Sequence, residues 1–197
     1  MKLREKLENN GALRPLLAEI APILEKGADR NTYVLFCRQR EAAGYQYAKS
    51  EGELHIVYGT RPDLCRALLA AACSARQHGE EKRWFREFGY MADCSRNAVA
   101  GVETLKKLVR ITALMGYQFL GLYLEDTIGV ESEPYFGYMR GAYTKEEIRE
   151  VIRYADLFGV EIRPYVQTLA HLNQITRYEH YRKFIDTDDI LLAGDER

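Results

Sequence analysis

Polar residues follow two apolar stretches in the second half of this sequence, and their side chains are of kinds that bind or hydrolyse polar substrates. The run Phe119–Leu124 stops at Glu125 and Asp126, and a later apolar run stops at His171. A second acidic pair, Asp195 and Glu196, lies close to the last residue. Carboxylates and imidazoles serve as general acids and bases, and enzymes built on parallel sheets carry them at the carboxyl ends of strands. We therefore take Glu125, Asp126 and His171 as candidate site residues.

The elements around these residues alternate between helix and strand. We expect helices over residues 102–115 and from Thr144 to Gly159, where Glu147 completes a capping box. Strands are expected over 119–124, 160–169 and 189–193, the last after a polar helical stretch. Such alternation is typical of a parallel α/β fold.

The residue count bears on how much of such a fold is present. A (β/α)8 TIM barrel needs about 250 residues, at about 30 residues for each βα unit. Only 105 residues remain from Asp93 to Arg197. We therefore expect about three βα units, so that the chain stops inside its barrel.

The first half has a different pattern. Leucine and isoleucine spacing predicts a helix over residues 3–26, and three strand-like runs follow at 32–37, 44–49 and 54–58. We expect Glu51-Gly52 to form a hairpin turn between the last two runs, and a helix from about Pro62 to end before Gly79. The predicted fold class is therefore α/β, with a small α/β domain over 1–85 and a truncated TIM-barrel part over 86–197.

Several linked motifs carry a family resemblance. Residues Met91-Ala-Asp-Cys-Ser-Arg96, Tyr123-Leu-Glu-Asp126 and Tyr143-Thr-Lys-Glu-Glu-Ile-Arg-Glu150 occur in that order, and Gly159-Val-Glu-Ile-Arg-Pro164 leads on to Ala170-His171. Over residues 88–175 the sequence resembles the family 20 glycoside hydrolases, the β-N-acetylhexosaminidases. The preceding segment is similar to the small domain before the barrel in that family.

This resemblance implies an activity and site residues. The family removes terminal β-linked N-acetylhexosamines with retention, and the substrate's own acetamido oxygen attacks the anomeric carbon. By resemblance, Arg96 binds the 3- and 4-hydroxyls of the sugar, while Asp126 and His171 match residues that follow the first two strands. With Glu125, they form the predicted substrate-binding set.

The sequence also departs from the family. Gly121-Leu-Tyr-Leu-Glu replaces a His-rich first strand, and Gln167 replaces an aspartate, which indicates a divergent branch. The family's catalytic Asp-Glu pair follows a further full helix, so we interpret Asp195-Glu196 as a coincidence and expect the true pair beyond residue 197. Two alternatives stay open. One is an active oligomeric glycosidase that uses Asp195 and Glu196, and the other is a non-catalytic glycan-binding module.

Composition excludes other classes of protein. Twenty-eight basic and 29 acidic residues give a net charge of −1, which argues against nucleic-acid binding. No apolar run is long enough for a membrane span, no signal peptide is recognisable, and four unpaired cysteines suggest a cytoplasmic protein. No spacing of ligands predicts a metal, and we expect no cofactor. An open barrel edge would favour self-association.

Overall fold

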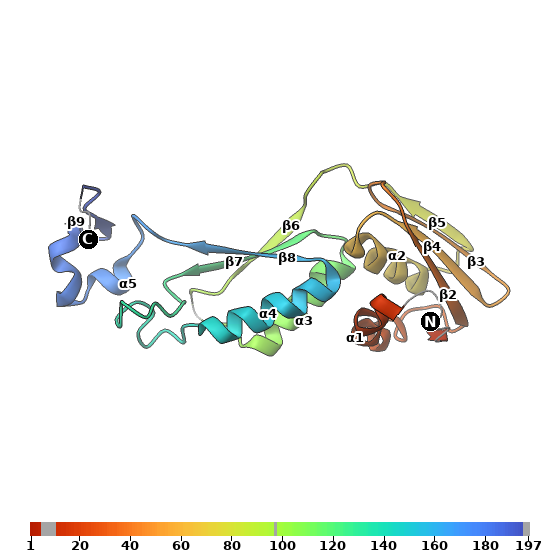
Figure 1. Ribbon diagram of the computed structural model, residues 1–197, viewed down its shortest axis with the longest axis horizontal. Coiled ribbons are helices and arrows are strands. Elements are labelled where there is room, and N and C mark those ends of the chain that lie inside the picture. Colours follow the sequence, from red (N-terminus) through yellow and green to blue (C-terminus); the bar gives the residue numbers. More distant parts are fainter. Residues whose placement is uncertain (5–10, 97, 195–197) are drawn as a thin grey trace. The chain divides into compact units, whose positions relative to one another are not determined.

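The computed structural model describes residues 1–4, 11–96 and 98–194 (Figure 1). The chain forms two compact units, each built from three separate segments. The first comprises Met1–Tyr90, Lys106–Leu120 and Arg153–Glu161, and the second comprises Met91–Leu105, Gly121–Ile152 and Ile162–Arg197. The division expected between residues 85 and 86 stays a prediction.

A five-stranded sheet forms the centre of the first unit. Its order is β1-β2-β4-β3-β5, with bounds Lys2–Arg4 (β1), Thr32–Gln39 (β2), Tyr45–Ser50 (β3), Glu53–Tyr58 (β4) and His78–Glu81 (β5). Strands β1, β2 and β4 are parallel, whereas β3 runs antiparallel to both of its neighbours. The predicted hairpin is confirmed, since Glu51 and Gly52 have φ values of 40° and 84° between paired Ser50 and Glu53. Two successive left-handed residues are what a two-residue hairpin turn requires.

Two helices bury their apolar faces in this unit, after a 3-10 turn at Gly11–Leu13 (η1). They are α1 (Arg14–Leu24) and α2 (Arg61–Cys73). Helix α1 buries Leu16, Ile20 and Leu24, the four-residue spacing of one helical face. Helix α2 begins with a capping box in which Thr60 and Asp63 exchange hydrogen bonds.

A buried ion pair lies beneath this sheet. The Lys49 ammonium on β3 donates to Asp29 Oδ2 at 2.6 Å, and to the carbonyl oxygens of Ala71 and Ser74 at 2.8 and 2.7 Å. Tyr33 also donates to Asp29, at 3.1 Å. All three donors of the lysine are therefore used, as a charge removed from water requires.

Two expectations for this half are wrong in detail. Residues Leu3 and Arg4, expected to begin a helix, lie in β1 instead, because Lys2–Arg4 pair with Thr32–Val34 of β2. The segment His78–Glu81, where no strand was expected, is strand β5, because it pairs with Tyr45–Ala48. In both places pairing with a distant strand overrides local preference.

A three-stranded sheet contains the alternating strands and helices expected for the second half of the sequence. Its order is β6-β7-β8, with bounds Gly89–Asp93, Phe119–Glu125 and Glu161–Val166. Helix α3 (Val102–Leu114) joins β6 to β7 and helix α4 (Lys145–Phe158) joins β7 to β8, the alternation that Figure 1 shows from yellow-green to blue. Strands β6 and β7 are parallel, because residue numbers increase in the same direction along both. Gln118 N–H donates to Phe88 O near their starts, and Cys94 N–H donates to Tyr123 O near their ends.

The predicted α/β class is therefore confirmed, but the strand count is corrected. Strand β6 was not expected, so the two strands predicted near 119–124 and 160–169 are the second and third of the sheet. The strand predicted at 189–193 is not in this sheet. It is β10 (Ile190–Leu191), paired antiparallel with β9 (Ile185–Thr187). That the sheet is part of a barrel stays a prediction.

The last segment is short and irregular. Helix α5 (Asn173–Thr176) and a 3-10 helix, η2 (Glu179–Phe184), precede the β9-β10 hairpin. Leu172, Ile175 and Tyr181 form a small core there. Within residues 1–4, 11–96 and 98–194, no helix combines the length and apolarity needed to cross a membrane.

Candidate functional site

Polar side chains gather where the three parallel strands end. Arg96 lies three residues after β6, Glu125 is the last residue of β7, and Gln167 directly follows β8. Carboxyl ends of parallel strands lie at one edge of a sheet, the position at which α/β proteins place their ligands. We call Arg96, Glu125, Asp126 and Arg140 the strand-end cluster.

An ion pair joins the ends of β6 and β7. Arg96 Nη1 donates to Glu125 Oε2 at 2.6 Å. The Glu125 side chain is 7% exposed and the Arg96 side chain 56% exposed, so the carboxylate is enclosed while the guanidinium faces solvent. The hydrogen bond from Arg96 to Glu125 raises the pKa of Arg96. The guanidinium also lies 5.6 Å from the centre of the Tyr123 ring. Arg96 is thus a fixed and accessible hydrogen-bond donor.

The turn that carries Arg96 is braced by Asp93. One oxygen of Asp93 accepts both the N–H of Ser95, at 2.8 Å, and its hydroxyl, at 2.9 Å. The backbone bond from Ser95 lowers the pKa of Asp93. The Ser95 hydroxyl in turn accepts a bond from Arg96 at 3.2 Å. This network sets the direction in which the arginine leaves the strand.

Arg140 holds the second carboxylate. Its Nε and Nη2 groups donate to Asp126 at 3.1 to 3.3 Å, and Nη2 also donates to the carbonyl oxygen of Ser95 and lies 3.5 Å from Glu125. Asp126 is 2% exposed at its side chain and Arg140 is 17% exposed. Such forked, enclosed pairs give geometric specificity, so Arg140 fixes both acidic residues and the β6 turn.

The loop after β7 brings Arg140 to the strand ends. Its two ends meet, because Tyr143 N–H donates to Thr127 O at 3.0 Å and Gly129 N–H donates to Tyr143 O at 2.9 Å. Between them the chain turns sharply at Gly137, whose φ is 72°. A Cβ added to Gly137 would lie 2.7 Å from the carbonyl oxygen of Asp126. Only glycine suits both requirements.

The backbone is strained at the centre of the site. Glu125 has a φ of 55°, which is uncommon for a residue other than glycine. The Gln167 N–H donates to the carbonyl oxygen of Glu125 at 3.3 Å, and the Gln167 amide donates to the hydroxyl of Tyr123 at 2.6 Å. Strained residues of this kind concentrate at functional sites, because the surrounding structure must hold them.

The structure brings together three of the four substrate-binding residues expected from the sequence. Arg96, Glu125 and Asp126 share one network with Arg140, which sequence reasoning missed. His171 is exposed, and its ion-pair partner, at 3.8 Å, is Asp189 near the β9-β10 hairpin. The alternative pair Asp195 and Glu196 lies outside the described residues.

This arrangement suits binding better than proton transfer. Each carboxylate of the strand-end cluster is held by an arginine, whereas a general acid needs a proton to give. Across residues 1–4, 11–96 and 98–194, no group of three or more His, Cys, Asp or Glu side chains is placed to hold a metal ion. An exposed guanidinium beside an enclosed carboxylate offers donors and an acceptor to neighbouring hydroxyl groups.

Comparison with known proteins identifies the fold. No protein-family model matches the sequence, and curated protein sequences give no significant match. Solved structures do match. An exo β-N-acetylglucosaminidase from Vibrio harveyi, in complex with N-acetylglucosamine, has a TM-score of 0.69 at 17% identity over 97% of this chain and 38% of its own. A β-N-acetylhexosaminidase from Streptomyces coelicolor has a TM-score of 0.70 at 16% identity, over 99% and 49%.

A third similar structure extends the coverage. The β-N-acetylhexosaminidase from Bacteroides fragilis has a TM-score of 0.70 at 15% identity, over 100% of this chain and 46% of its own. The chain therefore spans less than half the length of these proteins. Its fold is that of part of the family 20 β-N-acetylhexosaminidases, as expected for their N-terminal portion.

Proposed function

We propose that this chain is the N-terminal portion of an exo-acting β-N-acetylhexosaminidase of glycoside hydrolase family 20. The whole protein would remove terminal β-linked N-acetylglucosamine or N-acetylgalactosamine from glycans. In this proposal the first five strands belong to a small α/β domain, and β6, β7 and β8 are the first strands of a (β/α)8 barrel. The fold shared with hexosaminidase structures supports it.

One observation carries the proposal, namely the pairing of Arg96 with Glu125 at the strand ends. A sugar carries neighbouring hydroxyls that each donate and accept, and this pair presents a guanidinium at 56% exposure next to a carboxylate. Arg96 would donate to two sugar hydroxyls, and Glu125 would hold the arginine in position. Asp126 and Arg140 would keep this pair in register, because they join the β6 turn to the end of β7.

We expect the 197-residue chain to bind a sugar without hydrolysing it. The resemblance implies a catalytic Asp-Glu pair after a further helix, and the strand-end cluster supplies no group suited to protonate a leaving oxygen. Losing a general acid alone removes about 10²- to 10⁴-fold in rate. Asp195 and Glu196 are the alternative pair, and His171 stays a candidate for sugar binding by resemblance.

Binding and turnover are tested separately. N-acetylglucosamine is titrated into the ¹⁵N-labelled chain and the amide shifts of residues 93–97 and 123–127 are followed by NMR. We expect saturable shifts in the wild type. The affinity that they report should weaken about tenfold or more in Arg96→Ala, since a hydrogen bond from a charged donor is lost. Arg149→Ala is the matched control, because Arg149 is an exposed arginine in a surface pair with Glu146. Equal binding by Arg96→Ala and wild type would refute the role of Arg96.

Hydrolysis of a chromogenic N-acetyl-β-glucosaminide by the same chain tests whether it lacks the catalytic pair. No turnover is expected. Turnover that disappears in Glu196→Gln would instead identify Asp195 and Glu196 as the catalytic pair.

A further inference from the structure

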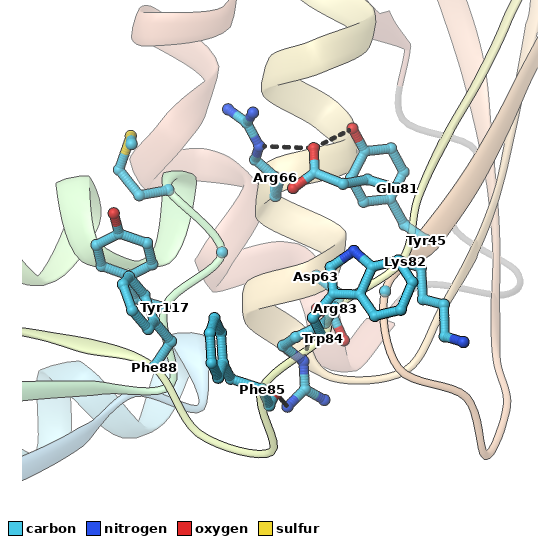
Figure 2. Close-up of a pocket in the computed structure, with 13 residues that line it drawn as sticks. Tyr45, Asp63, Arg66, Glu81, Lys82, Arg83, Trp84, Phe85, Phe88 and Tyr117 are labelled. Carbon is cyan, nitrogen blue, oxygen red and sulfur yellow. Dashed lines mark hydrogen bonds and ion pairs between the residues drawn. The ribbon is translucent and has the colours of Figure 1, made fainter.

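The first unit contains a pocket that the proposed sugar site does not use. Figure 2 shows its lining, which comes from the start of β3, helix α2, the end of β5, residues 82–88 and residues 115–117. Its volume is about 180 Å³. All of these segments belong to the first unit.

Exposed aromatic rings form one wall of this pocket. Trp84 is 82% exposed, and Phe85 and Phe88 are also exposed. The Phe85 and Phe88 rings stack with centroids 5.7 Å apart, and Phe88 meets Tyr117 edge to face at 4.8 Å. The Lys82 ammonium lies 4.9 Å from the Trp84 ring centre and covers one face of the indole. Gathered apolar surface of this kind marks a binding site more often than scattered apolar residues do.

The chain that carries these rings is held in place by Arg83. Its Nη1 donates to the carbonyl oxygen of Phe85 at 3.4 Å and to that of Arg86, and its Nε lies 3.4 Å from Asp63 of α2. Asp63 is itself fixed by the capping box at the start of α2. The rings therefore stay exposed on a braced segment, which lowers the ordering cost of binding a ligand.

Hydrogen-bonding groups line the opposite wall. In Figure 2 the linked side chains of Arg66, Glu81 and Tyr45 lie above the aromatic rings. Arg66 Nε is 3.3 Å from Glu81 Oε2, and the Tyr45 hydroxyl donates to the same oxygen at 3.3 Å. Burial and the charge of Glu81 raise the pKa of Tyr45 to about 12, so its hydroxyl stays protonated. Arg66 and Glu81 are partly exposed and can each bond a ligand as well.

We propose that this pocket binds one pyranose ring of an oligosaccharide, as a second glycan contact separate from the strand-end cluster. The C–H face of a pyranose packs on aromatic rings, here those of Trp84, Phe85 and Phe88. Its hydroxyls exchange hydrogen bonds with Arg66 and Glu81. The charged groups of the lining are mostly paired with one another, which favours a neutral ligand over an ionic one. The choice of a glycan rests on the proposed function.

Trp84 makes the test specific, because it is the one tryptophan of the chain. Triacetylchitotriose is titrated into the 197-residue chain while indole emission is followed. We expect a saturable blue shift with a Kd of about 1 mM, as for a small and shallow site. Arg66→Ala and Phe88→Ala keep the tryptophan, and each should weaken binding about tenfold or more. Far-UV circular dichroism checks that both variants are folded.

Two further variants separate this proposal from the proposed function. Arg96→Ala and the control Arg149→Ala should leave the Trp84 response unchanged. If Arg96→Ala alone abolished it, there would be one sugar site and the inference would be overturned. No saturable response in wild type, or a response that survives in both Arg66→Ala and Phe88→Ala, would overturn it as well. A response to an aromatic dipeptide but not to the saccharide would assign the pocket to a protein ligand and also contradict the inference.

Discussion

Arg140 offers the sharpest test of the strand-end cluster. It was not expected from the sequence, yet it makes three hydrogen bonds to a carboxylate that is 2% exposed. Replacing it by alanine would leave Asp126 charged, enclosed and without these bonds. Removing one partner of a buried ion pair costs about 3–5 kcal/mol. We therefore expect Arg140→Ala to lower the free energy of unfolding by that amount.

The measurement is urea denaturation at pH 7, followed by far-UV circular dichroism. A shift in midpoint at unchanged slope reports a change in stability rather than a change in the denatured state. A domain is stable by only about 5–15 kcal/mol, so part of the chain could unfold in Arg140→Ala. The double variant Asp126→Leu/Arg140→Met keeps the test informative, since it removes both charges and should recover most of the loss.

Arg149→Ala is the matched control. Arg149 also pairs with an acidic residue, Glu146, at 3.4 Å, but its side chain is 55% exposed and its partner 77% exposed. Exposed pairs contribute about 0–1 kcal/mol, so its midpoint should hardly move. Equal shifts for Arg140→Ala and Arg149→Ala would refute the claim that enclosure of Asp126 makes Arg140 important.

Four further predictions concern the buried ion pair of the first unit, the loop after β7 and the start of α4. Lys49→Met should cost about 3–5 kcal/mol, because Asp29 loses its buried partner, and Asp29→Asn/Lys49→Met should recover most of it in urea denaturation. Burial alone would raise the pKa of Asp29, but hydrogen bonds from Lys49 and its neighbours hold that pKa below its ordinary value. The stability that this carboxylate contributes is therefore present above about pH 4 and is lost as the pH falls further. Urea denaturation at pH 6 and at pH 3 tests this, because the wild type should lose more stability between the two than the double variant does. Gly137→Ala should weaken sugar binding measured by NMR, since its Cβ would displace the backbone of Asp126. Thr144→Ala should cost about 1 kcal/mol by thermal denaturation, because the Thr144–Glu147 capping box is lost.

Much of the fold follows from local patterns that the sequence displays. The apolar spacing of α1, the Glu51-Gly52 hairpin and the Thr144 capping box all predict what the structure contains. Glu125 and Asp126 could be predicted as site residues because they follow an apolar strand of a parallel fold, whereas Arg96 was placed with them by the family resemblance.

Other parts depend on contacts that no local pattern encodes. Strands β5 and β6 are short and polar or mixed, and they exist because a neighbouring strand pairs with them. Arg140 reaches Asp126 only through a loop with left-handed residues at Gly137, Met139 and Gly141, and helical or strand periodicity does not report loop conformations. The partner of His171 likewise depends on a hairpin that was expected to be a sheet strand.

The closed ends of the 127–143 loop have a consequence for how this scaffold can diverge. Because Tyr143 bonds to Thr127 and Gly129, the start of α4 is tied to the end of β7 whatever the chain does between them. Doubling the length of a loop costs only about 0.6 kcal/mol in closure entropy. Insertions between residues 130 and 134, ahead of Gly137 and Arg140, would thus lengthen the loop while the sheet and both helices keep their places. That stretch of the loop can therefore change in length and sequence without loss of the bonds that Arg140 makes to the strand ends.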